Sequence, residues 1–71
     1  MSTVTLVVIP GPGARSVNVT ETMTIQDLVV RENLHGRDII VNGSGVTPTQ
    51  YSTTTVVPGS EIFATGSVKG N

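Results

Sequence analysis

The stretch that decides the fold is the C-terminal one, Pro58-Gly-Ser-Glu-Ile-Phe-Ala-Thr-Gly-Ser-Val-Lys-Gly-Asn71. Pro58-Gly59 is typical of a turn, because proline presets φ at one corner and glycine supplies the positive φ of the next. The four residues that start at Ile62 favour a short strand, and after them no apolar period remains to be buried. We therefore expect one domain over residues 1–66 that ends on its last strand, followed by a flexible tail over 67–71.

Two strands are expected at the start of the chain. Residues 3–9 are rich in β-branched side chains and alternate in polarity, as residues 15–20 also do, which favours strands. Residues 10–14 hold two prolines and two glycines, and this composition predicts a hairpin loop between antiparallel strands. The alternation turns one set of side chains toward the core: Val4, Leu6, Val8, Val17 and Val19.

One helix is predicted from Thr24 onward. Thr24 is a good N-cap, and the carboxylate of Asp27 can reach back to the N-cap N–H and meet the positive end of the helix dipole. An apolar stripe follows at helical spacing, formed by Ile25, Leu28, Val29 and Leu34. Asn33 and Gly36 tolerate the left-handed conformation that ends a helix. A helix of about nine residues is too short to stand alone, so it must pack on a sheet.

Further strands are expected after the helix. Residues 37–41 contain three consecutive apolar side chains, which is typical of a central strand buried on more than one side. Asn42-Gly43 is the strongest turn signal in the chain, and residues 53–57 have the composition of another short strand. Together with the last strand, this order predicts an α+β domain in which one helix packs across a mixed sheet of four or five strands. The first and last strands should lie side by side and parallel at the centre of the sheet.

The composition limits the classes of function. A chain of 71 residues has room for one domain, and the absence of cysteine excludes disulfides and thiolate metal sites. The net charge is −1 with the charges scattered, which argues against a nucleic-acid or membrane surface as partner. Residues 1–9 lack the basic start and the length of a signal peptide or membrane span.

The charged content is unusually low. It is 13%, where about 25% is usual. Two interpretations remain open, a surface that lies against another protein or a surface that is soluble through its many Thr and Ser hydroxyls.

The chain is poorly equipped for catalysis. It has no cysteine nucleophile and one histidine, His35, which we expect to be a solvated residue near the helix C-terminus. Gly11 and Gly13 are not followed by a helix or a Lys-Ser/Thr pair, so that loop is a hairpin and not a phosphate loop. We expect no enzyme activity, no catalytic residues, no metal and no cofactor.

A contact surface is expected on the sheet face opposite the helix. If Val4, Leu6 and Val8 point inward, then Val7 and Ile9 point outward, with Phe63 outward near them. Such an apolar patch would bind a partner. The alternatives are that residues 44–57 fold over it, or that the assumed alternation is shifted by one residue.

The order of four segments resembles that of the ubiquitin-like β-grasp proteins. The segments are Thr24-Ile-Gln-Asp-Leu28, Ile40-Val-Asn-Gly43, Val46-Thr-Pro48 and Pro58-Gly-Ser-Glu-Ile62. The resemblance is closest to the small sulfur carriers of thiamine and molybdopterin synthesis and to related archaeal modifiers. It covers nearly the whole chain, and the order and spacing of the segments carry it.

The resemblance implies a role for the C-terminus. In that family an activating enzyme adenylates the carboxylate of a terminal Gly-Gly, which becomes a thiocarboxylate or an isopeptide. This chain ends in Lys69-Gly70-Asn71, so Gly70 matches one glycine position and Asn71 departs from the last. Lys69, Gly70 and Asn71 are therefore candidate contact residues, beside the sheet patch.

Two functions remain open. The first is a non-enzymatic ubiquitin-like protein that acts by protein contact, as an accessory component of a larger assembly such as a phage or virus particle. The second is a sulfur carrier or protein modifier, whose partner is an E1-like activating enzyme with ATP. Either protein would be cytoplasmic or built into a particle assembled in the cytoplasm, with no nucleic acid and no membrane as partner.

Overall fold

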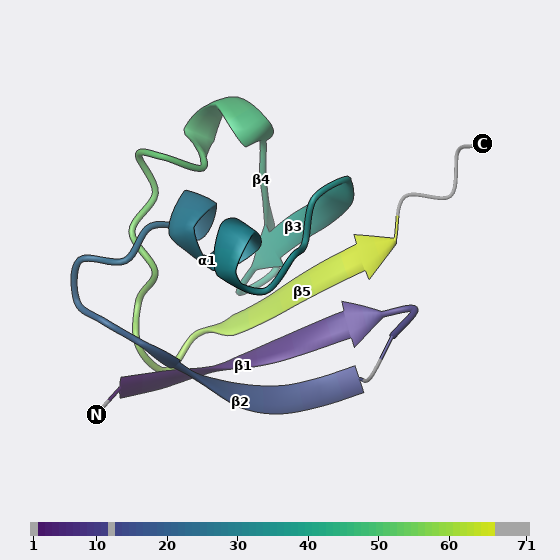
Figure 1. Cartoon of the computed structure of the whole chain (residues 1–71), viewed down its shortest axis with the longest axis horizontal. Coiled ribbons are helices and arrows are strands. Elements are labelled where there is room, and N and C mark those ends of the chain that lie inside the picture. The colour runs from purple at the N-terminus through teal and green to yellow at the C-terminus, as the bar shows by residue number, and fades with distance from the viewer. Residues whose placement is uncertain (1, 12, 67–71) are drawn as a thin grey trace.

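The computed structural model describes residues 2–11 and 13–66. Within them the elements are β1 (Ser2–Ile9), β2 (Gly13–Val19), α1 (Ile25–Arg31), β3 (Arg37–Val41), β4 (Ser44–Val46), the 3₁₀ helix η1 (Pro48–Gln50) and β5 (Glu61–Gly66). The strands form one sheet in the order β2-β1-β5-β3-β4 (Figure 1). β1 and β5 are parallel neighbours, and the other pairs are antiparallel.

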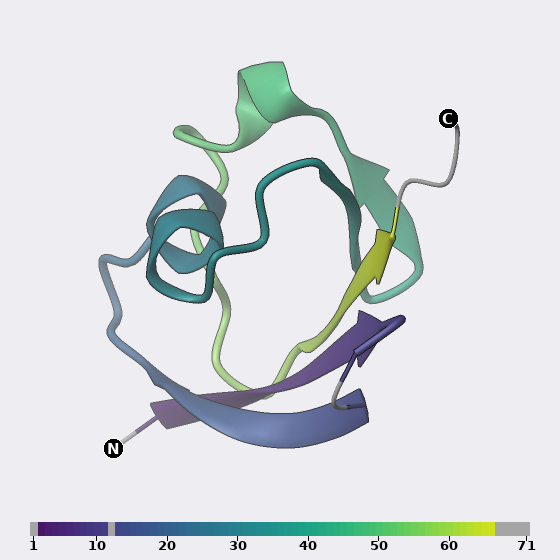
Figure 2. The ribbon, with the colours of Figure 1, turned by 45° about the vertical axis from the view of Figure 1, so that its right-hand side comes forward.

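The sheet curves around α1, which lies against its concave face (Figure 2). A mixed sheet with a single α-helix across it, in the part of the chain that the structure describes, confirms the predicted α+β β-grasp architecture. The first and last strands lie side by side as expected, with β5 in the middle of the sheet.

The N-terminal hairpin forms as the alternation predicts. Val4 of β1 pairs with Val17 of β2, and all five side chains predicted to point inward are buried. β2 begins at Gly13 and not at Arg15, because Gly13 (φ 86°) already pairs with Val8 and so belongs to the ladder.

The N-terminus of α1 has the predicted capping box. The N–H of Asp27 donates to Thr24 Oγ1 (3.2 Å), and the N–H of Thr24 donates to Asp27 Oδ2 (3.0 Å). The helix has seven residues, which is shorter than expected, since Asn33 adopts a left-handed φ of 57° soon after Arg31. Leu34 is nevertheless buried, because the chain beyond the helix still runs over the core.

The predicted strand over residues 53–57 is wrong. That segment makes one isolated bridge, between Thr55 and Thr24. The strand that follows β3 in the chain is instead β4. The tight turn at Asn42 (φ 48°) and Gly43 (φ 87°) returns the chain at once along β3, as a two-residue hairpin does. Ser44 to Val46 therefore pair in spite of their modest strand propensity.

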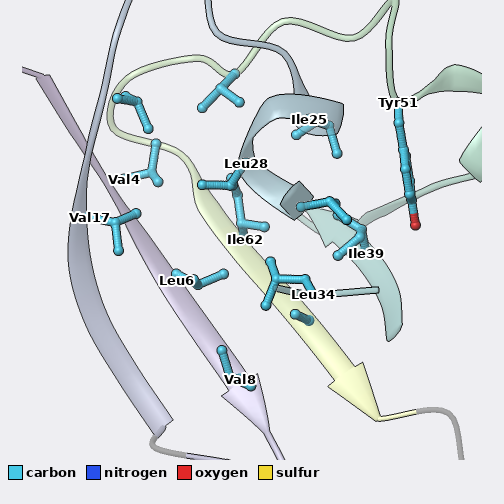
Figure 3. Close-up of a cluster of buried hydrophobic side chains, with 14 residues drawn as sticks. Val4, Leu6, Val8, Val17, Ile25, Leu28, Leu34, Ile39, Tyr51 and Ile62 are labelled. Carbon is cyan, nitrogen blue, oxygen red and sulfur yellow. The ribbon is translucent and has the colours of Figure 1, made fainter. Parts of the chain in front are cut away.

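Residues 47–57 instead pack beside α1 and close the core on that side. The N–H groups of Ile25 and Gln26, which no residue within the helix can satisfy, donate to the carbonyls of Thr54 (2.8 Å) and Tyr51 (3.0 Å). Figure 3 shows Tyr51 at the edge of the buried cluster, with Leu28 and Ile62 near its middle. The buried apolar residues are Val4, Leu6, Val8, Val17, Val19, Ile25, Leu28, Val29, Leu34, Ile39, Tyr51, Val56, Ile62 and Ala64.

Candidate functional site: the outer face of the sheet

The face of the sheet opposite α1, here called the outer face, carries a continuous line of apolar residues. Val7 of β1 and Ile40 of β3 are both direct partners of Phe63 on the central strand β5. Ala14 extends the line beyond Val7 and Gly45 extends it beyond Ile40. We call these five residues, one from each strand, the apolar row.

The three large side chains of the apolar row are half-buried. Side chains of cross-strand neighbours on one face lie close enough to shield part of each other's surface from solvent. Each can therefore be half-buried although no other segment covers it. Ile9, two residues beyond Val7 on β1, is 49% exposed. The structure thus brings the predicted contact residues Val7, Ile9 and Phe63 onto one face.

Ile40 is the residue of this face that sequence reasoning missed. The run Ile39-Ile40-Val41 predicted a strand buried on more than one side, and this is wrong for β3. Ile39 is buried but Ile40 is only half-buried, because the described chain covers the sheet on the helix side alone. Strand alternation was the available signal: if Ile39 points inward, Ile40 points outward.

A negative charge borders the apolar row. Glu61 lies on β5 two residues before Phe63 and is exposed. The described residues that share this face include no Lys or Arg. A partner surface that complements it would be apolar at its centre and basic at its rim.

The segment that could have covered the apolar row lies elsewhere. Tyr51 and Val56 point into the core beside α1, and Val56 N–H donates to the carbonyl of Met23 (2.8 Å). Residues 47–57 therefore occupy the helix side of the molecule, and the outer face stays open within the described chain. The other predicted contact residues, Lys69, Gly70 and Asn71, lie outside the described residues.

A pocket of about 530 Å³ opens on the helix side. Val29, Leu34 and Tyr51 supply its apolar wall, and His35 and Asp38 are among its polar residues. Burial, with a smaller contribution from the negative charge of Asp38, raises the pKa of the Tyr51 hydroxyl above its ordinary value of 10.0. His35 is exposed and lies three residues beyond the helix C-cap Glu32, farther from the helix end than we expected.

Neither a cluster of potential metal ligands nor a membrane-spanning helix occurs among the described residues. They contain no group of three or more His, Cys, Asp or Glu side chains placed to hold an ion. None of the helices among them has the length and apolar character needed to cross a bilayer.

Comparison with known proteins gives the fold a second line of support. Neither the models of known protein families nor the curated proteins include a significant match to this chain. Among solved structures, the thiamine biosynthesis protein ThiS from Geobacter metallireducens is similar, with a TM-score of 0.68 and 17% sequence identity. The match covers 94% of this chain and 99% of ThiS.

This likeness concerns the fold of the chain. The similar protein is named for thiamine biosynthesis, and the match lends no support to a role in a phage or virus particle. Since the match spans nearly all of both chains, the likeness concerns the whole fold and not a fragment of it. The chain therefore has the ubiquitin-like β-grasp fold, and this fold is similar to that of ThiS.

Proposed function

We propose that this protein is a small carrier of the ubiquitin-like type, whose C-terminal end is activated by an E1-like enzyme with ATP. It does no chemistry itself; it binds the enzyme and presents its end. The full-length structural likeness to ThiS supports this function. The carrier would then work in the cytoplasm, where such an enzyme and its ATP are found.

One observation carries the proposal: the apolar row is centred on β5, the strand that leads directly to the C-terminal segment. Phe63 lies three residues before Gly66, the last residue of β5, and a strand advances about 3.3 Å per residue. An enzyme that binds the apolar row therefore contacts the chain about 10 Å from Gly66, where the chain leaves the sheet. Binding of the enzyme this close to the C-terminal end of the carrier would limit the positions that this end can take, and such positioning favours reaction.

The outer face also defines the docking surface on the enzyme. Val7, Phe63 and Ile40 would enter an apolar depression, while Glu61 would meet a basic side chain at its rim. Rim charges mainly speed association and select partners, whereas the desolvated centre supplies most of the affinity. The interaction should weaken moderately with added salt and strongly when the centre of the row is changed.

The direct test is ATP–pyrophosphate exchange by the activating enzyme of the source organism, with the carrier as substrate. Both the full chain and a chain that ends at Gly70 are assayed, because Asn71 departs from the family's terminal glycine. We expect exchange with at least one of them, and intact mass after reaction with a sulfur donor should show oxygen replaced by sulfur at the terminus. Exchange with neither chain would overturn the proposal.

A matched pair of variants tests the docking surface. Ile40→Glu places a charge in the apolar row, and Val30→Glu places the same charge on α1, where Val30 is 55% exposed. We expect Ile40→Glu to raise KM by about tenfold or more, as loss of a central contact does, and Val30→Glu to leave it unchanged. Equal KM values for the two variants, both folded by circular dichroism, would show that the enzyme docks elsewhere.

A further inference from the structure

The end of β5 is held differently from the rest of the strand. The parallel ladder between β1 and β5 stops at the pair Ile9 and Thr65. Gly66, one residue further, still has Arg37 of β3 as its ladder partner on the other side. The last residue of β5 therefore lacks a paired neighbour on β1.

The side chain of Arg37 connects β3 with the end of β1. Arg37 is half-buried, and its Nη1 donates a hydrogen bond to the carbonyl oxygen of Ile9 (3.2 Å). Since β5 lies between β3 and β1 in the sheet, this bond spans the end of β5. Arg37 thus links the three central strands where β1 and β5 end.

Gly66 provides the space for this contact. A Cβ atom at Gly66 would lie 2.6 Å from Cδ of Pro10, 3.4 Å from the Ile9 carbonyl oxygen and 3.5 Å from Arg37 Nη1. The closest of these atoms belongs to a proline ring, which cannot rotate away as a flexible side chain can. The packed end of β5 therefore requires glycine at this position.

Arg37 also differs from the other arginines in what it binds. Arg15 and Arg31 both pair with Glu32, whereas Arg37 has no carboxylate within ion-pair distance among the described residues. Its side chain donates to the backbone carbonyl of Ile9, and a hydrogen bond from a charged donor is stronger than one from a neutral donor. Within the described residues, this bond holds the backbone at Ile9 in place and pairs Arg37 with no carboxylate.

We propose that Arg37 is a positioning residue for activation of the C-terminus. By bonding to Ile9 across β5, it fixes the place and backbone direction of Gly66, from which the terminal segment continues. The apolar row determines whether the enzyme binds, and Arg37 determines how accurately the bound chain delivers its end. This role rests on the proposed function, whereas the restraint of Gly66 by Arg37 does not depend on that function and is tested separately.

The restraint is tested by NMR relaxation of the full chain. Arg37→Gln removes the charged donor, and Arg31→Gln is the matched control, because it makes the same chemical change at a surface pair of little energetic weight. We expect the order parameter of the Gly66 N–H to fall from about 0.85 to below about 0.6 in Arg37→Gln alone. An unchanged order parameter would overturn the proposal.

The role in activation is tested by kinetics with the same variants. We expect Arg37→Gln to lower kcat by about tenfold to a hundredfold, as misplacement of a reacting group does, with KM unchanged because the apolar row is intact. Arg37→Lys, which keeps a charged donor, should recover part of kcat. The Ile40→Glu variant should show the opposite pattern, with the change in KM.

The possible failures can be told apart. A mobile Gly66 with normal kcat would overturn the positioning role and leave the proposed function standing. No activation of the wild-type chain would overturn the proposed function and with it the role of Arg37 in activation, while the relaxation data would still decide whether Arg37 restrains Gly66.

Discussion

Tyr51 shows how one residue can serve the core and the surface together. Its ring is buried beside α1, its carbonyl accepts the N–H of Gln26, and the residue lines the helix-side pocket. A phenol is suited to such a place, because the ring is apolar while the hydroxyl tolerates water. Partial burial favours the neutral hydroxyl over the phenolate, and the charge of Asp38 acts in the same direction.

The raised pKa of Tyr51 predicts a stability change at alkaline pH. Because the folded state holds the proton more tightly than the unfolded state, the stabilisation is fully present below about pH 10 and is lost as the pH rises through the folded pKa. Chemical denaturation between pH 8 and 12 should show a loss of unfolding free energy in the wild type that is smaller in Tyr51→Phe. Identical pH profiles for the two proteins would contradict the shift.

The titration can be observed directly, since Tyr51 is the only tyrosine and the chain has no tryptophan. Absorbance at 295 nm should give a midpoint above 10 in the folded protein and about 10 in denaturant. Asp38→Asn should lower the folded midpoint only in part, because burial is the larger cause. If Asp38→Asn lowered the folded midpoint all the way to the midpoint in denaturant, the charge of Asp38 and not burial would be the larger cause of the raised pKa.

At the scale of elements, α1 depends on contacts at its first turn. A helix of seven residues is far below the length that is stable alone in water. Three N–H groups of its first turn are satisfied from outside the helix, two by carbonyls of Tyr51 and Thr54 and one by the Thr24 hydroxyl. The N-cap and the segment 47–57 therefore stabilise the helix together with its buried face.

Loss of the N-cap should destabilise the whole domain. Thr24→Ala removes the hydroxyl that accepts the Asp27 N–H, and such changes cost about 0.5–2 kcal/mol. For a domain of this size, 1 kcal/mol corresponds to a fall in Tm of roughly 4–8 °C. Calorimetry should show this fall for Thr24→Ala and little change for Thr24→Ser, which keeps the hydroxyl. Equal Tm values for all three proteins would mean that the hydroxyl contributes nothing.

The turn between β3 and β4 also ties two parts of the sheet together. The side-chain oxygen of Asn42 accepts the N–H of Glu61 (2.9 Å), and the Asn42 N–H donates to the Glu61 carbonyl (2.8 Å). Asn42 therefore has two roles. It adopts the left-handed conformation of the turn, and it binds the start of β5 to the end of β3. The first is visible in the Asn-Gly dipeptide, and the second depends on β5 being adjacent to β3.

At the scale of the whole molecule, stability depends on one small core. Domains of about 70 residues without disulfides rarely have more than about 3–5 kcal/mol from their core. Ile62 lies on the central strand, is fully buried and faces α1 (Figure 3). A few buried side chains of this kind therefore contribute most of the free energy of folding.

Truncation of Ile62 should bring the domain close to unfolding. Ile62→Ala leaves a cavity in the core, and such changes cost about 2–5 kcal/mol. Val57→Ala is the control, because Val57 is 59% exposed and surface changes usually stay within about 0.5 kcal/mol. Urea denaturation followed by circular dichroism measures both, and an unfolding midpoint for Ile62→Ala near that of the control would contradict the single-core account.

Much of the fold could be predicted because its signals are local. The inward side chains of β1 and β2 follow from alternation, the start of α1 from Thr24 and Asp27, and the turn from Asn42-Gly43. The prediction of a strand at 53–57 failed for a complementary reason. Thr-Val composition favours a strand wherever it occurs. Here the edge of β3 is paired with β4, which follows it through the tight turn, so residues 53–57 have no strand edge of β3 to pair with.

The candidate site was only partly predictable. The sequence by itself determined which residues alternate, so it placed Val7, Ile9 and Phe63 on an outward face and led to the correct fold class. Only the tertiary structure decided the strand order, which aligns Val7, Phe63 and Ile40 in one row and brings Arg37 across Gly66 to Ile9. The physical reason is that alternation is a property of each strand alone, whereas a row across strands depends on pairing between residues far apart in the chain.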